Sequence, residues 1–239
     1  MPDKLFFFVD PKNISNSNFT LDKTESNHLL KVLRVKVGSE IWLTDGSGNS
    51  YRAILQTYRS NIVGGKILQV LPQYSENIFE ISCAIGILKK NKMDLVVEKA
   101  TELGVTRIIP LILDRSIKRD VNIVRLYRIA QATVKQCGRS VIPEIFNPIR
   151  LDDLLKIYGN DNLIVCHKSG KLIDSRLLKS AKNKKEILLF IGPEGDFSKS
   201  EIIQLKKHNA KFINLGNRRL RSETAVITAL SLLNNILNN

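Results

Sequence analysis

The sequence predicts an α/β protein in which a small β domain precedes a larger domain built on a parallel sheet. Three observations predict this class. Apolar residues alternate over short stretches up to residue 72, whereas from residue 73 apolar strands alternate with amphipathic helices. The chain has 239 residues, 43% of them hydrophobic, which is enough for two cores. We therefore expect domains at residues 1–72 and 73–239.

The first domain is expected to be a small barrel with one short helix. The turn sequence Asp45-Gly46-Ser47-Gly48-Asn49 separates two of its strands, and helical spacing of apolar residues runs from His28 to Arg34. The polar stretch 72–77 predicts the connection to the next domain. The strands are expected at 4–9, 40–43, 51–56 and 62–70.

The second domain shows a regular alternation of apolar strands and helices, which is typical of a parallel sheet with helices on both faces. The strands are expected at 79–88, 107–113, 162–166, 187–191 and 212–215. The helices are expected at 92–103, 121–136, 152–158, 199–208 and 223–237.

Composition favours a polyanionic partner. The chain has 37 basic and 23 acidic side chains, a formal net charge of +14, and the usual polyanion inside a cell is nucleic acid. Its longest apolar stretches, 5–9 and 187–191, are far shorter than the roughly 18 to 20 residues that cross a bilayer. The N-terminus lacks the apolar core of a secretory signal. We expect a cytoplasmic protein without a membrane partner.

The cysteines argue against two classes of protein. Cys83, Cys137 and Cys166 are odd in number and widely spaced, without a Cys-x-x-Cys pair. This pattern is unlike a disulfide framework and unlike a zinc site, so we expect reduced thiols and no metal. His28, His167 and His208 are too scattered to form a metal site together.

The first candidate site is a glycine loop that follows the strand at 187–191. Gly192 and Gly195 would let a ligand approach the main chain closely, and ligands of open α/β sheets bind beyond the carboxyl ends of the strands. Ser198 and Glu201 have capping-box spacing, which marks the start of a helix. The same spacing also fits an ordinary connection between a strand and a helix.

A second glycine loop precedes the C-terminal helix. Arg218, Arg219 and Arg221 lie beside Gly216 and the start of that helix, where they could bind phosphate, a carboxylate or a developing oxyanion. Neither loop contains the dinucleotide motif Gly-x-Gly-x-x-Gly or a phosphate loop, which argues against an NAD enzyme and a nucleoside triphosphatase.

Four ordered motifs resemble the bacterial ribosomal RNA small subunit methyltransferase E family, and the match extends over nearly the whole chain through 28–34 and Asp45-Gly46. The motifs are Lys99-Ala100-Thr101-Glu102-Leu103-Gly104-Val105, Gln136-Cys137-Gly138-Arg139, Ile-Gly-Pro-Glu-Gly at 191–195, and Leu-Gly-x-Arg-x-Leu-Arg-x-Glu-Thr-Ala at 215–225. The chain departs from the family pattern at Lys135, often glutamate, and at Asp196, where a second glycine is expected.

The resemblance implies an S-adenosylmethionine-dependent enzyme of the SPOUT class that methylates N3 of uridine 1498 in 16S ribosomal RNA. It implies an N-terminal PUA-like barrel, a C-terminal α/β domain with a trefoil knot, and a homodimer that acts on the assembled or nearly assembled small subunit. Methyl transfer to uracil N3 leaves negative charge on O2 and O4 as the imide proton departs, so rigid donors aimed at that charge would accelerate the reaction.

The resemblance also assigns residues. The catalytic candidates are Arg221 and Arg139 as donors, with Glu223 as a base or as the group that orients an arginine. The candidates for RNA contacts are Arg34, Lys36, Arg52, Arg115 and Arg219. The candidates for cofactor binding are His167, Ile191, Gly192, Pro193, Glu194, Gly195, Leu215, Gly216, Leu220, Arg221 and Thr224.

Two other functions are compatible with parts of the pattern. Another SPOUT enzyme, acting on a different base or on ribose, would share the knotted pocket, but the motifs at 99–105 and 136–139 argue against it. A non-catalytic RNA-binding assembly factor would suit the charge and the β domain. The two glycine loops and the arginine cluster argue against that function.

Overall fold

The structure is a computed structural model that describes residues 5–59, 61–159, 162–172 and 186–238. The chain divides into two compact units. The first comprises Met1–Glu76 together with Gln131–Ile142, and the second comprises Asn77–Ala130 together with Pro143–Asn239. Residues 131–142, which the sequence pattern assigns to the second domain, therefore belong to the first unit by their contacts.

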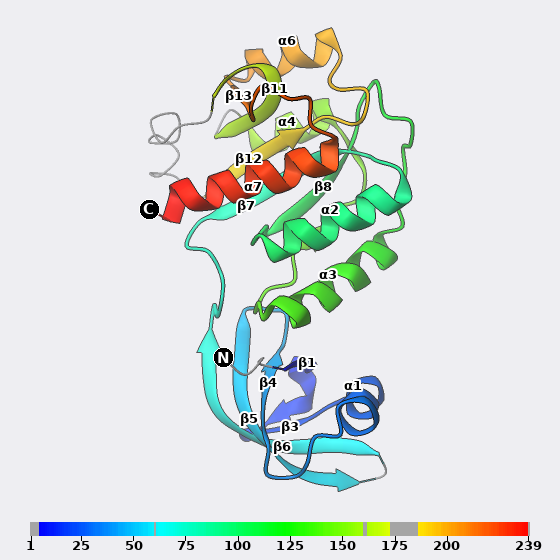
Figure 1. Ribbon diagram of the computed structural model, residues 1–239, viewed down its shortest axis with the longest axis vertical. Helices are drawn as coiled ribbons and strands as arrows, with labels where there is room; N and C mark the ends of the chain where they lie inside the picture. Colours follow the sequence, from blue (N-terminus) through cyan, green and yellow to red (C-terminus); the bar gives the residue numbers. More distant parts are fainter. Residues whose placement is uncertain (1–4, 60, 160–161, 173–185, 239) are drawn as a thin grey trace. The chain divides into compact units, whose positions relative to one another are not determined.

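The first unit contains a six-stranded mixed sheet (Figure 1). The strands lie in the order β1-β4-β5-β6-β3-β2; β1 pairs with β4 in parallel, and the other neighbours pair antiparallel. Their bounds are Phe6–Phe8 (β1), Ile14–Ser15 (β2), Asn18–Thr20 (β3), Glu40–Thr44 (β4), Asn49–Arg59 (β5) and Ile62–Pro72 (β6). Lys4, in the expected first strand, lies outside the described residues.

Short helical segments connect these strands. A 3-10 turn, η1, spans Pro11–Asn13, and α1 spans Lys23–Asn27. The α1 helix begins after Asp22, whose Oδ1 accepts the N–H of Glu25 at 2.8 Å, and it continues directly into the π-helix η2 at His28–Val32. The helix expected from His28 is therefore the second half of a longer helical segment.

Alternate residues of the strands form the core of the first unit, as the two-residue period of a half-buried strand requires. The buried side chains are Phe7, Val9, Phe19, Leu21, Leu29, Ile41, Leu43, Tyr51, Ala53, Leu55, Val63 and Ile67. The expected turn between β4 and β5 is organised by Asp45, which is 5% exposed. Its carboxylate accepts the N–H groups of Ser47 and Asn49 and the hydroxyl of Tyr51 at 2.8 to 3.1 Å.

The second unit is a parallel α/β domain. Its main strands lie in the order β10-β8-β7-β12-β11-β13, and β9 also pairs with β8. The strands are Glu80–Gly86 (β7), Arg107–Ile112 (β8), Glu144–Ile145 (β9), Ile149–Arg150 (β10), Leu163–Leu172 (β11), Glu186–Ile191 (β12) and Lys211–Asn214 (β13). The helices are Lys90–Glu102 (α2), Leu151–Tyr158 (α4), Lys199–Lys207 (α6) and Ser222–Asn238 (α7). A further helix, α3 (Ile123–Cys137), begins in the second unit, and its residues from Gln131 onward belong to the first.

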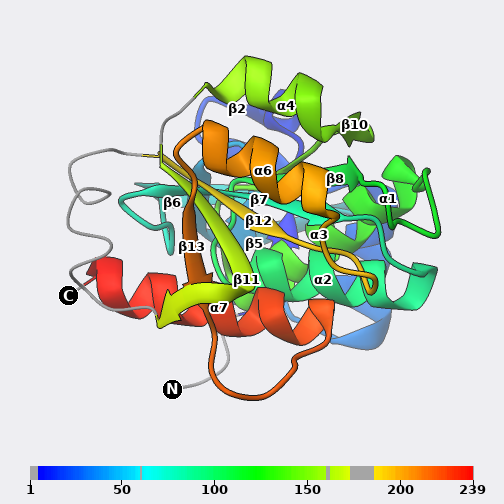
Figure 2. The same cartoon turned by 90° about the horizontal axis from the view of Figure 1, so that it is seen from above.

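Helices cover both faces of this sheet, as the sequence pattern predicts (Figure 2). On one face α4 and α6 contribute Leu154, Leu155 and Leu205 to a core shared with Val165 and Phe190 of the strands. On the other face α2 packs against α7, and α7 also contacts β12. Among the described residues, no helix is long and apolar enough to cross a membrane.

The order of the strands brings the ends of β12 and β13 beside the middle of β11. Because β11 pairs in parallel with both β12 and β13, Cys166 lies beside Ile191 on one side and beside Ile213 on the other. The loops that follow β12 and β13 therefore start from the same edge of the sheet, next to the residues after Cys166. This edge is where ligands of open α/β sheets bind.

Candidate functional site

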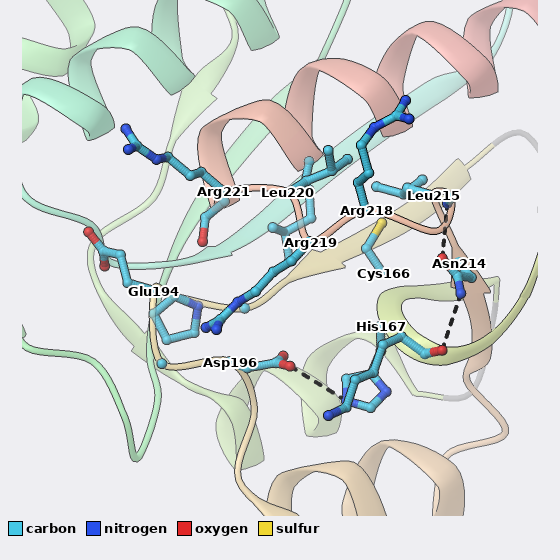
Figure 3. A pocket seen from close by; sticks show the side chains of 18 of the residues that line it. Cys166, His167, Glu194, Asp196, Asn214, Leu215, Arg218, Arg219, Leu220 and Arg221 are labelled. Carbon is cyan, nitrogen blue, oxygen red and sulfur yellow. Dashed lines mark hydrogen bonds and ion pairs between the residues drawn. The ribbon is translucent and has the colours of Figure 1, made fainter.

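A pocket of about 870 Å³ lies at the ends of β12 and β13, beside residues 166–168 in the middle of β11 (Figure 3). Three stretches of chain form its walls, at 166–168, 191–196 and 214–222. Lys92, Arg115 and Ala225 also line it. The two glycine loops singled out by the sequence pattern thus form one pocket. The third wall comes from the middle of β11, which continues to Leu172, beyond the strand end expected at Cys166.

Most residues expected to bind the cofactor line this pocket. They are His167, Ile191, Gly192, Pro193, Glu194, Gly195, Leu215, Gly216, Leu220 and Arg221. Arg115 and Arg219, expected to contact phosphate, line it too. Arg218, named with Arg219 and Arg221 in the arginine cluster, lines it as well. Several further lining residues were not among the candidates, including Lys92, Lys168 and Asn214.

The first glycine loop packs closely against the segment after β8. A Cβ atom on Gly195 would lie 2.9 Å from Cβ of Arg115, so a larger residue would force that segment to move. Arg115 in turn donates from Nη1 to the carbonyl of Gly195 at 3.0 Å. This contact holds the guanidinium at the pocket, although the side chain comes from another strand end.

The helix after this loop begins as the capping-box spacing predicts. The hydroxyl of Ser198 accepts the N–H of Glu201 at 3.2 Å, and Oε2 of Glu201 accepts the N–H of Ser198 at 2.7 Å. Oε1 of Glu201 also accepts the N–H of Asp114 at 2.8 Å, next to Arg115. The cap therefore fixes both the start of α6 and the segment that carries Arg115.

The second glycine loop is tied to the middle of β11. Asn214 donates from Nδ2 to the carbonyl of Lys168 at 3.2 Å, and its Oδ1 accepts the N–H of Gly216 at 2.9 Å. Gly216 has φ of 124°, a conformation that side chains disfavour. Beyond this turn Arg218, Arg219 and Arg221 are all exposed at the pocket, where they can reach an anionic ligand.

Lys92 is the functional candidate that the sequence pattern missed. Its Nζ lies 3.2 Å from Oε1 of Glu194 in the first glycine loop and 3.9 Å from Oε2 of Glu223 at the start of α7. Burial alone would raise the pKa of Glu194, but backbone N–H groups and Lys92 outweigh it and lower that pKa. In the sequence, the one feature that could have identified Lys92 as a pocket residue is its position just after the strand expected at 79–88.

All three cysteines are free thiols. Cys83 and Cys166 are buried free thiols, and Cys137 is a partly buried one. Burial raises the pKa of the Cys83 thiol to about 12, so it remains protonated. No group of three or more His, Cys, Asp or Glu side chains that could hold a metal ion occurs among the described residues.

Comparison with known families identifies both parts of the chain. Residues 75–234 match the family described as RNA methyltransferase domain, and residues 21–57 match the RNA methyltransferase PUA domain. Ribosomal RNA small subunit methyltransferase E of Rickettsia conorii is 31% identical over 229 residues, which cover 94% of this chain and 92% of that protein. The chain belongs to the ribosomal RNA small subunit methyltransferase E family. The predicted RNA methyltransferase with an N-terminal PUA domain is confirmed.

Solved structures of other family members and relatives show the same fold over the whole chain. Ribosomal RNA small subunit methyltransferase E from Neisseria gonorrhoeae, bound to S-adenosyl methionine, is 28% identical, with a TM-score of 0.86 and 98% of both chains covered. A methyltransferase from Legionella pneumophila in complex with the cofactor SAM is also 28% identical, with a TM-score of 0.82 and 98% of both chains covered. The predicted α/β fold is thereby confirmed.

Arg139, a catalytic candidate from the family motif, has a different setting from Arg221. It belongs to the first unit, is 2% exposed, and directs its guanidinium at Glu76. The Nη2 to Oε2 distance is 2.5 Å, and Nε lies 3.0 and 3.2 Å from the two carboxylate oxygens. Glu76 also accepts the N–H groups of Ser140 and Val141 at 2.9 and 3.0 Å. This buried pair anchors residues 139–141 beside Glu76.

Glu223 and Thr224 are outside the set of described residues that line the pocket. Glu223 is 8% exposed, and its Oε2 has no hydrogen-bond partner within the described part of the chain, with Lys92 at 3.9 Å. The carboxylate therefore faces the ammonium of Lys92, which does line the pocket. Thr224 is exposed on the first turn of α7.

The remaining candidates for RNA contacts belong to the first unit. Arg34 has φ of 51° and follows η2, and Lys36 is exposed close behind it. Arg52 lies on β5 opposite Trp42, and its Nε is 3.6 Å from Oε2 of Glu40 with 43% of the side chain exposed. All three cations belong to the unit that contains the PUA match.

Proposed function

We propose that the chain transfers a methyl group from S-adenosylmethionine to N3 of uridine 1498 in 16S ribosomal RNA of the small subunit. One observation carries the proposal: two glycine loops and the middle of β11 form a single pocket in a chain of this family. We further propose that it works in the cytoplasm as a homodimer, and that the second unit is threaded as a trefoil knot.

The pocket suits S-adenosylmethionine as the methyl donor. The stretches of its wall at 191–196 and 214–217 contain Gly192, Gly195 and Gly216, which leave room for close approach to the main chain, and its volume of about 870 Å³ is in the range of small-molecule sites. The two relatives bound to this cofactor share the fold across 98% of the chain. The cofactor carries an activated methyl group on its sulfonium, so we assign no metal to the reaction.

The task left to the protein is to place the uracil and to stabilise charge on it. Loss of the imide proton puts negative charge on O2 and O4, and fixed cationic donors lower the energy of that state. We assign this role to Arg221, which lines the pocket at the start of α7. Arg139 is assigned a structural role instead, because its guanidinium is buried against Glu76.

Glu223 is assigned to Lys92 rather than to the uracil. Its carboxylate is almost fully buried and outside the pocket lining, so it cannot take a proton from a bound base without moving. Its negative charge instead favours an ammonium at Lys92, which already pairs with Glu194. Lys92 would then keep the start of α2, the first glycine loop and the start of α7 together.

RNA binding is assigned to cations in both units. Arg115 and Arg219 at the pocket are placed to contact phosphates beside the target base, and Arg34, Lys36 and Arg52 would hold RNA on the PUA unit. Such contacts fix the position of RNA without reading its sequence. Their number is consistent with the net charge of +14.

The dimer is proposed from the flanks of the buried stripe of α7. Ile227, Leu232 and Ile236 remain partly exposed there, although Val226, Ala229, Leu230 and Leu233 already fill the core-facing side. A helix that packs only onto its own sheet needs one apolar stripe. A second copy of the chain would cover the additional apolar surface.

Transfer of labelled methyl from S-adenosylmethionine to three acceptors tests the function. The acceptors are small subunits from a strain lacking this activity, naked 16S ribosomal RNA, and transfer RNA. We expect stoichiometric transfer to the subunits and little to transfer RNA. Preferential labelling of transfer RNA would favour another SPOUT enzyme, and no transfer with tight RNA binding would favour an assembly factor.

A further inference from the structure

The chain differs from its family at one position of the pocket wall, where Asp196 replaces an expected glycine. Asp196 has φ of 61°, a conformation that glycine adopts freely and that aspartate tolerates better than most residues. Its N–H donates to the carbonyl of Pro193 at 2.9 Å. Aspartate thus occupies a position whose backbone conformation suits glycine better. Its side chain extends along the pocket.

The carboxylate of Asp196 has a fixed direction. Its Oδ1 accepts the N–H of Phe197 at 2.8 Å, and Phe197 is buried in the core of the sheet. The other oxygen, Oδ2, is turned towards His167, and its distance to Nε2 is 3.6 Å (Figure 3). The carboxylate thus points from the first glycine loop to the middle of β11.

The imidazole of His167 is held from its other side. Ser169 donates its backbone N–H to Nδ1 at 3.1 Å, and its hydroxyl lies 2.7 Å from the same nitrogen. Because Nδ1 accepts that N–H, the neutral ring carries its proton on Nε2, the atom that faces Asp196. The ring also meets Phe212 edge-on, with centroids 6.1 Å apart, and its side chain is 8% exposed.

We propose that Asp196 is a positioning residue that holds the ring of His167, whose tautomer Ser169 sets, in one orientation, as a preformed wall of the methyl-donor pocket. A glycine at 196 cannot supply this contact. The inference rests on the proposed function, since it assigns the pocket to the methyl donor. We therefore expect Asp196 to contribute to ligand affinity rather than to folding. A side chain that is already ordered in the free protein loses no conformational entropy when the ligand binds.

The decisive variant is Asp196→Gly, in which affinity and stability should change in opposite directions. Glycine removes the backbone strain, so the thermal midpoint should stay the same or rise. The dissociation constant of S-adenosylhomocysteine, measured by calorimetry on the full chain, should increase at least fivefold. The ring resonances of His167 should broaden or divide because the ring loses its single orientation, while the Nε2–H tautomer set by Ser169 remains.

Two further variants control for backbone and size. Asn209→Gly makes the same kind of change at another exposed residue with positive φ, 56°, outside the pocket lining, and should alter neither affinity nor the ring resonances of His167. Asp196→Asn keeps the size but loses the charge. If the side-chain oxygen of the asparagine still accepts the N–H of Phe197, its NH₂ group faces Nε2–H of His167, and two donors then meet. The variant should therefore weaken ligand binding as Asp196→Gly does.

A double-mutant comparison isolates the pair itself. If Asp196 acts through His167, then Asp196→Gly should add little to the loss caused by His167→Gln. Unchanged affinity and unchanged ring resonances of His167 in Asp196→Gly would overturn the inference and leave the proposed function standing. Failure of the wild-type chain to bind S-adenosylhomocysteine would instead contradict the proposed function, while the ring shifts would still report on the contact between Asp196 and His167.

Discussion

Nζ of Lys92 lies 3.2 Å from Oε1 of Glu194, and this pair joins the start of α2 to the glycine loop that follows β12. Both side chains are less than one third exposed, so water screens the pair only in part. The pair is one of several contacts that hold the pocket walls before any ligand arrives. Its protonation behaviour gives the first prediction.

Lys92→Gln should change how stability depends on pH. The pKa of Glu194 is lowered in the folded chain, so its stabilising contribution is present at neutral pH and disappears as pH falls through the folded pKa, below the ordinary value of 4.5. The variant loses part of that contribution. Its deficit in the free energy of unfolding should therefore be larger at pH 7 than at pH 3, as measured by urea titration.

The matched control for this prediction is Lys156→Gln. Lys156 pairs with Asp153 at 3.0 Å, but the side chains are 75% and 53% exposed, so removal should cost below about 0.5 kcal/mol at either pH. An equal deficit for Lys92→Gln at pH 3 and pH 7 would show that the lysine does not set the pKa of Glu194.

Arg139→Ala should destabilise the fold more than it slows the reaction of the folded enzyme. Removing one partner of a buried ion pair leaves an uncompensated charge and costs about 3–5 kcal/mol, and the side chains of Arg139 and Glu76 are 3% and 5% exposed. Urea unfolding measures the loss. Methyl transfer per folded molecule, measured at low temperature, should stay within a few-fold of wild type.

Arg125→Ala provides the comparison, because Arg125 lies on α3, which ends at Cys137 shortly before Arg139. Arg125 bonds Asp94 at 2.7 to 3.2 Å, but 48% of its side chain is exposed and water screens the pair, so its removal should destabilise the fold far less than Arg139→Ala does. If Arg139→Ala were as stable as Arg125→Ala yet inactive, Arg139 would be a catalytic donor after all.

Arg221→Ala should lower the catalytic constant and leave RNA affinity nearly intact. Removing one preorganised donor costs on the order of 3 kcal/mol, or about a hundredfold in rate. Single-turnover methyl transfer with saturating RNA measures this step. Full activity under those conditions would identify Arg221 as a phosphate contact.

Lys36→Ala and Arg52→Ala should behave in the opposite way. Each substitution should weaken RNA binding for all sequences and flatten its salt dependence. Binding releases counterions from each phosphate that a cation contacts, so a variant with one contact fewer releases fewer of them. A titration of RNA affinity across a salt series measures the slope. An unchanged slope with a lower catalytic constant would contradict their assignment to the RNA surface.

Light scattering at micromolar concentration should give about twice the chain mass of 27.0 kDa. Substitution of Leu232 by glutamate should shift this mass to that of one chain, because the side chain is placed on the partly exposed side of α7. A wild-type mass of one chain would refute the dimer.

Much of the second unit could be predicted because its elements are long and periodic. The strand expected at 187–191 spans Glu186–Ile191, and the Ser198–Glu201 cap is present as its spacing indicates. The two glycine loops were also identifiable, since glycines after apolar strands have a recognisable position at a sheet edge. The sequence pattern therefore located most of the pocket lining.

The features that the sequence pattern missed depend on contacts between distant residues. The strands β2 and β3 have two and three residues, which is too short for an alternating pattern of apolar residues to be detected in the sequence. Residues 131–142 belong to the first unit, where Arg139 pairs with Glu76, 63 positions away. Lys92 reaches the pocket through Glu194, 102 positions away, and no local motif records such a pairing.

Mapping the methylated nucleotide tests the central claim most directly. Small subunits from a strain lacking this activity are incubated with the enzyme and S-adenosylmethionine, and their 16S ribosomal RNA is then digested and sequenced by mass spectrometry. We predict one 3-methyluridine per subunit, at uridine 1498, with Arg221→Ala producing about a hundredfold less in the same short reaction time. A methyl group on ribose, on another base or at another uridine would contradict the account.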